Sequence, residues 1–71
     1  MRKKKELKNV SSKKIYFDEP FIRGLEHHGI PIDLKTRKRI AALNGIPNYD
    51  GRSTQNEALS EIASKFGLII E

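Results

Sequence analysis

Cysteine is missing from this chain of 71 residues, and so is any apolar run long enough to cross a membrane. Without cysteine, neither a disulfide nor a thiolate-bound metal stabilises the fold, and the chain suits synthesis in a reducing compartment. A chain of this length forms one small domain with a modest core. Assembly into an oligomer is one remaining way to bury more apolar surface.

The N-terminal segment is basic, but the apolar stretch of a secretory signal does not follow it. Residues 1–14 hold seven Lys and Arg against one acid, whereas residues 15–71 hold seven against eight. The foldable part is therefore close to neutral. The basic part is a solvated linker, a solubility tag or an arm for polyanions such as nucleic acid or anionic wall polymers. We expect no signal peptide and no membrane span.

Residue sets for catalysis or metal binding are also missing. The chain has no nucleophile elbow, phosphate loop or recognisable carboxylate pair. His27 and His28 are adjacent, so on a helix they point about 100° apart, and no i, i+4 histidine or carboxylate cluster completes a metal site. We expect no enzyme activity, metal or cofactor. One histidine should pack on the core, or at a ligand or subunit contact, and the other should be exposed.

Periodicity places one folded domain at 13–71, after a flexible basic leader or linker at 1–12. Residues 13–17 (KKIYF) are β-branched and aromatic, which predicts a short strand, and residues 68–71 (LIIE) are predicted to pair with it. Three helices are predicted between the strands, over residues 18–29, 33–45 and 53–67. The fold class is therefore α+β: a small single domain with three short helices and a minimal two-stranded β element.

Capping and stop residues mark the ends of each predicted helix. The predicted N-terminal caps are Asp18, Asp33 and Thr54, the last in a capping box with Glu57. The predicted stops are Gly29, Gly45 and Gly67. Gly-Ile-Pro follows the first two helices, at 29–31 and 45–47, and each isoleucine is expected to turn inward and plug the core.

Apolar faces are clear on two of the helices. The first helix has such a face at Phe21, Ile22, Leu25 and His28. The third has one at Ala58, Leu59, Ile62, Ala63 and Phe66. Gly24, inside the first helix, costs about 1 kcal/mol relative to alanine, so this helix needs tertiary support.

The stretch LNGIPNYDGRSTQN (43–56) joins the second and third helices, and turn formers explain much of it. They do not explain the side chains of Tyr49, Arg52, Gln55 and Asn56. An exposed tyrosine can stack on the apolar face of a sugar, while nearby amides and a guanidinium reach hydroxyl, N-acetyl or carboxylate groups. We therefore predict these four residues as ligand contacts, with Asn48 and Asp50 shaping the loop. Second-tier candidates, for a ligand or an interface, are Tyr16, Phe17 and His28.

A helix-turn-helix interpretation is the main alternative. The second and third helices flank a turn that contains Gly45, as in DNA-binding units of this type. However, the connection is longer than the usual three or four residues. The would-be recognition helix also carries Glu57 and Glu61 against a single Lys65, and acids repel DNA phosphates. Nucleic acid is therefore not the expected partner.

One family shares a pattern with this chain. The pattern runs Arg39-Ile40-Ala41, Asn44-Gly45-Ile46, Asn48-Tyr49-x-Gly51, Gln55-Asn56 and Leu59. It resembles the C-terminal cell-wall-binding region of endolysins from phages of Gram-positive bacteria. The preceding KIYFDEPFIRGLEHHGIPIDLKTRKRIA is similar to the lead-in of such domains in enterococcal phage amidases, so the resemblance covers roughly residues 9–71. The family's threonine after Gly51 is replaced here by Arg52.

The resemblance implies a non-catalytic domain that directs a peptidoglycan amidase or other hydrolase to the wall of a Gram-positive host. It implies synthesis in the host cytoplasm without a signal peptide, and action at the wall after release. In such endolysins an internal start can yield the domain as a free subunit, so the full-length endolysin or identical copies, up to a tetramer, are expected partners. A DNA-binding phage regulator, or a module that only assembles with other proteins, are the alternatives.

Overall fold

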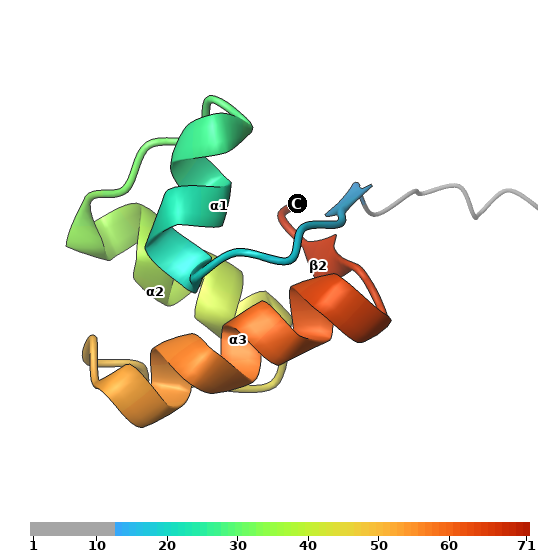
Figure 1. Cartoon of the computed structure of the whole chain (residues 1–71). Coiled ribbons are helices and arrows are strands. Elements are labelled where there is room, and N and C mark those ends of the chain that lie inside the picture. Colours follow the sequence, from blue (N-terminus) through green and yellow to red (C-terminus); the bar gives the residue numbers. More distant parts are fainter. Residues whose placement is uncertain (1–12) are drawn as a thin grey trace, which may run out of the picture.

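A computed structural model describes residues 13–71, and Figure 1 shows how their elements are arranged. The elements are β1 (Lys14–Ile15), α1 (Phe21–His27), α2 (Leu34–Leu43), α3 (Ser53–Lys65) and β2 (Leu68–Ile69). The predicted α+β class, with three short helices and two short strands, is confirmed. The predicted leader at 1–12 lies outside the described residues. No helix in the described part of the chain is long and apolar enough to span a bilayer.

The two strands bring the ends of the folded body together, as predicted. They are antiparallel, with Lys14 opposite Ile69 and Ile15 opposite Leu68. Beyond the regular pairs, the amide of Ile70 donates to the carbonyl of Lys13 at 2.9 Å. Each strand has two residues, so the pairing is shorter than the predicted segments.

The core lies where α3 packs across α1 and β2 (Figure 1). Its buried members come from every element except β1: Phe17, Phe21, Leu25, Ile40, Ala41, Tyr49, Leu59, Ala63 and Leu68. Three residues of the predicted apolar faces are exposed instead, namely His28, Ala58 and Phe66. Each lies at one end of its helical stripe. Those three assignments were wrong, and the centres of both stripes were right.

The two Gly-Ile-Pro segments end α1 and α2 by the same mechanism. Gly29 and Gly45 have positive φ angles of 71° and 91°. The amide of Ile30 donates to the carbonyl of Leu25 at 2.9 Å, and the amide of Ile46 donates to the carbonyl of Ala41 at 2.8 Å. This is the Schellman pattern, in which the residue after the left-handed glycine bonds back into the last turn. Both isoleucines pack on the core, as predicted.

The helix starts follow the predictions less well. Asp33 caps α2, because its carboxylate accepts from the amide of Thr36 at 3.2 Å and from the hydroxyl at 2.8 Å. The hydrogen bond from the Thr36 hydroxyl, and to a smaller extent that from the Thr36 amide, lowers the pKa of the Asp33 carboxyl. Asp18 does not cap α1, which begins after Pro20 without a side-chain cap. Nor does Thr54 cap α3, since that helix begins one residue earlier, at Ser53, after Arg52.

The packing of α1 requires glycine at position 24, although glycine weakens a helix. A Cβ atom at this position would lie 2.2–2.5 Å from three ring carbons of Phe17, which come from the segment between β1 and α1. The missing side chain lets the aromatic ring lie directly on the α1 backbone. Phe17 is therefore a core residue, and this is the tertiary support that the sequence required for α1.

Asn44 acts as a clasp between the end of α2 and β2. Its amide nitrogen donates to the carbonyls of Ile40 and Ile69, both at 2.7 Å, and its oxygen accepts from the amide of Ile69 at 2.9 Å. The side chain of Asn44 thereby occupies the amide and the carbonyl of Ile69, with which a third strand would otherwise form hydrogen bonds. This role of Asn44 was not predicted from the sequence.

We expect Gly24→Ala to lower the free energy of unfolding by about 1–3 kcal/mol, because the added methyl group overpacks against Phe17. Helix propensity alone predicts the opposite sign, a gain of about 1 kcal/mol. Urea unfolding followed by circular dichroism measures the difference. The loss should shrink in a Phe17→Leu background, and an equal loss in both backgrounds would show that the ring is not the cause.

We expect Asn44→Ala to cost about 1–3 kcal/mol of stability, because it leaves the amide and carbonyl of Ile69 without their partner. The matched control is Asn48→Ala, an exposed asparagine of the next connection. Hydrogen exchange at Ile69 should accelerate only in the first variant. Unchanged exchange there would contradict the clasp.

Candidate functional site

Tyr49, the predicted stacking residue, is buried. Its side chain is 3% exposed, and its ring meets that of Phe21 edge-on with centroids 6.1 Å apart. The hydroxyl accepts from Nη1 of Arg37 at 3.1 Å and donates to Oδ1 of Asn56 at 2.6 Å. The expectation of an exposed tyrosine was wrong, since no ring face is open for a sugar. Tyr49 instead fixes the loop to α2 and α3.

Gln55 is used to organise the loop that precedes its own helix. Its side-chain oxygen accepts from the amides of Asp50 at 2.9 Å and Arg52 at 3.3 Å, and its nitrogen donates to the carbonyl of Asn48 at 3.1 Å. Arg52 is the N-cap residue of α3, so the hydrogen bond from its amide to the side chain of Gln55 is one half of a capping box. The loop is therefore held in one shape by a residue predicted as a ligand contact.

The rest of the predicted loop residues are at the surface. Asn48, Asp50 and Arg52 are exposed, the last with 74% of its side chain accessible. The guanidinium Nε of Arg52 lies 3.1 Å from a carboxylate oxygen of Asp50, an exposed ion pair of small energetic value. These three side chains remain available to a ligand.

The second-tier candidates separate in the structure. Tyr16 is exposed, Phe17 is buried, and His28 is exposed with its ring centroid 6.0 Å from that of Phe17. His27 is also exposed and pairs through Nδ1 with the carboxylate of Glu19. Both histidines are exposed, and the ring of His28 lies beside Phe17 of the core, as expected for one of the two.

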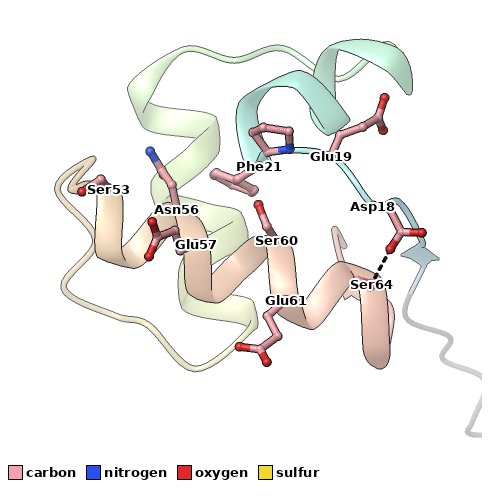
Figure 2. Close-up of a pocket in the computed structure, with 10 residues that line it drawn as sticks. Asp18, Glu19, Phe21, Ser53, Asn56, Glu57, Ser60, Glu61 and Ser64 are labelled. Carbon is pink, nitrogen blue, oxygen red and sulfur yellow. Dashed lines mark hydrogen bonds between the residues drawn. The ribbon is translucent and has the colours of Figure 1, made fainter.

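An open groove runs between the start of α1 and one face of α3, and Figure 2 shows its lining. The volume of the groove is about 560 Å³. Ten residues line it: Asp18, Glu19, Pro20, Phe21, Ser53, Asn56, Glu57, Ser60, Glu61 and Ser64. Six of them recur along α3 at helical spacing, so the polar face of this helix forms one wall. The segment before α1 forms the other.

The lining is rich in hydrogen-bond acceptors and carries negative charge. It holds four carboxylates, three hydroxyls and one amide, and no lysine or arginine. Lys65, outside the groove, donates to Glu61 at 2.7 Å, and this bond lowers the pKa of the Glu61 carboxyl. Across one end, the hydroxyl of Ser64 donates to Asp18 at 2.5 Å (Figure 2). The groove therefore suits ligands with hydroxyl or ammonium donors.

Asn56 connects the predicted site with the groove. It accepts the Tyr49 hydrogen bond and is also the one predicted contact that lines the groove. The apolar stripe of α3 did not predict the groove, because the groove lies along the polar face of that helix. The signal was present, since Ser53, Glu57, Ser60 and Ser64 follow one another at spacings of three or four residues. No group of three or more metal-ligating side chains gathers anywhere in residues 13–71.

No protein-family model, curated protein or solved structure matches this chain.

We expect Tyr49→Phe to lower the free energy of unfolding by about 1–3 kcal/mol, because Arg37 and Asn56, both half-buried, lose their hydrogen-bond partner. The matched control is Tyr16→Phe, which removes the hydroxyl of the exposed tyrosine and should leave stability within about 0.5 kcal/mol of wild type. Chemical denaturation measures both. Equal stability of the two variants would show that the buried hydroxyl does not hold the loop.

Proposed function

We propose that this domain binds the cell wall of a Gram-positive bacterium without catalysis and directs a phage endolysin to it. The observation that carries the proposal is the groove along α3, whose walls place four carboxylates, three hydroxyls and an amide around a mostly apolar surface. The residue pattern that resembles endolysin wall-binding regions supports it independently.

The chemistry of the groove matches the donors that a wall presents. Sugar hydroxyls and the amines of peptide stems donate hydrogen bonds, and ionised carboxylates are strong acceptors for both. Glu57 and Glu61 lie one helical turn apart on α3, so they can receive two donors of one extended ligand. The exposed loop side chains of Asn48, Asp50 and Arg52 supply further contacts beside the Ser53 end of the groove.

A single domain binds weakly through an open groove, and its retention on the wall increases when several domains are joined. A shallow site buries only part of its ligand, which limits affinity. A wall offers the same chemical unit many times, so joining several domains raises residence on it. The full-length endolysin, or identical copies of this chain, would provide that multiplicity. The domain acts outside the host membrane, after release from the cytoplasm in which it is made.

The groove gives no support to the helix-turn-helix alternative. On α3, the helix that would enter a DNA groove, Glu57 and Glu61 lie on the face that borders the open space. Carboxylates at that position oppose phosphates rather than neutralise them. We therefore expect no DNA binding, and a gel shift with random DNA is the negative control.

Purified walls of a Gram-positive bacterium test the proposal in a sedimentation pull-down. The wild-type domain should be enriched over a control protein of equal charge. The double variant Glu57→Gln/Glu61→Gln should bind about tenfold more weakly, because it loses charge-assisted hydrogen bonds. Glu26→Gln, an exposed acid of α1 outside the groove, should bind like wild type.

Two outcomes would overturn the proposal. One is no enrichment of wild type on any wall preparation. The other is a salt-sensitive shift of random DNA at concentrations where walls are not bound. If the double variant binds walls like wild type, wall binding would stand and the groove would be the wrong place.

A further inference from the structure

Acidic side chains gather in the groove, whereas basic ones are concentrated at the start of the chain. Residues 15–71 hold eight Asp and Glu, and four of these line the groove: Asp18, Glu19, Glu57 and Glu61. The leader, residues 1–12, holds five Lys and Arg against the single acid Glu6. One molecule therefore contains an acidic groove and a basic segment of equal and opposite formal charge.

The carboxylates of the groove have partners that another cation can replace. Glu57 takes part in no ion pair among residues 13–71. Glu61 pairs with Lys65 one turn further along α3, and both side chains are exposed. Such a pair is worth only about 0.3–0.5 kcal/mol, so it does not keep a competing ammonium group away. The negative charge of the groove is therefore open to neutralisation.

The leader is long enough to reach every part of the groove. It joins the folded body at Lys13, five residues before Asp18, so an extended backbone spans about 17 Å from there to the Asp18 end. Figure 2 shows β1 beside Asp18 at that end. The groove follows α3 from Ser53 to Ser64, about 17 Å at 1.5 Å per residue. The twelve residues of the leader extend to about 40 Å, which exceeds the sum of the two distances.

The side chains of the leader match the groove in polarity as well as in charge. The groove places its carboxylates around a mostly apolar surface. A lysine lays its methylene stem along such a surface while its ammonium group reaches an acceptor at the edge. Leu7 and Val10 stand on either side of Lys8 in the leader and supply further apolar groups.

We propose that the leader lies in the groove of its own chain and competes there with the external ligand. The ammonium groups of Lys3, Lys4 and Lys5 pair with the carboxylates on α3, as the amines of a ligand would. The contact itself does not require wall binding, but its role as a competitor rests on the proposed function. The leader then regulates the site, because a ligand has to displace it before binding.

Covalent attachment favours the chain's own leader over that of a second copy. A segment linked to its site acts at an effective concentration on the order of millimolar. The leader of another molecule acts only at the bulk concentration, which is far lower in a dilute sample. Complementary charge also brings the segment and the groove together, and added salt weakens that attraction.

A spin label on the leader tests the contact without any wall. Because the chain has no cysteine, Glu6→Cys provides a single site for a nitroxide and keeps every cation of the leader. Nuclear magnetic resonance should show that the nitroxide broadens the amide signals of Glu57 and Ser60, which line the groove. About 1 M salt should restore these signals, because it screens charges beyond about 3 Å.

Charge reversal separates docking from mere proximity of the label. In the labelled chain, Lys3→Glu/Lys5→Glu should restore the groove signals. The matched control is Lys35→Glu/Lys38→Glu, which reverses two exposed lysines of α2 outside the groove and should leave the broadening unchanged. Thermal unfolding checks that each variant is folded. Absence of broadening in the parent, or equal broadening after reversal of the leader, would overturn the contact.

A mixed sample identifies the molecule that supplies the leader. Spin-labelled chain without isotopes is combined with isotope-labelled chain that carries no nitroxide. The groove signals of the second chain should stay sharp, because each leader occupies its own groove. Broadening in this mixture as strong as within one molecule would overturn the intramolecular contact in favour of exchange between copies.

Sedimentation with Gram-positive walls tests the competition. Lys3→Gln/Lys5→Gln releases the leader and should tighten wall binding by about threefold, since a larger fraction of the grooves is then open. Equal or weaker binding than wild type would overturn the competition. If neither protein binds any wall, the proposed function fails, and the spin-label result still decides whether the leader occupies the groove.

Discussion

The hydroxyl of Tyr49 is the point on which the arrangement of the domain depends. It joins Arg37 of α2 to Asn56 of α3, while its ring packs on Phe21 at the start of α1. Arg37 also donates to the carbonyl of Ile32 at 2.7 Å, so the connection before α2 is tied in as well. A domain this small has few such contacts to spare, because its core is modest. The same hydrogen bond holds the side chain of Asn56, which lines the groove.

Local rules predicted the helix ends well wherever the determining residues were neighbours in the chain. The two Gly-Ile-Pro stops and the Asp33 cap need only residues within one turn, and all three are found. Rules of the same kind failed for Asp18, which instead accepts a hydrogen bond from Ser64, 46 positions away. A cap residue is free to leave its own helix when a distant partner offers a better contact. The sequence does not show that partner.

Exposure was the quantity that sequence patterns predicted least well. Tyr49 lies among turn formers in the sequence, which suggested a surface residue. A tyrosine can nevertheless be buried when its hydroxyl both accepts and donates a hydrogen bond, as it does here. Gly24 shows the reverse case, where a residue that weakens a helix is explained only by the ring of Phe17. The polar face of α3 is visible in the sequence, but the groove that it forms with a second wall is not. Its two walls come from segments that are more than 30 residues apart in sequence, and only tertiary structure brings them together.

The Asn44 clasp also determines how the small sheet can grow. Both outward backbone groups of Ile69 are occupied by a side chain, so β2 offers no ladder at that residue to an incoming strand. Among residues 13–71, the other edge of the sheet is the outer edge of β1. If two molecules paired through that edge of each, the clasp would stop the ladder at Ile69 on both sides. The asparagine that holds the chain end in place thereby also opposes the repeated strand addition that builds fibres.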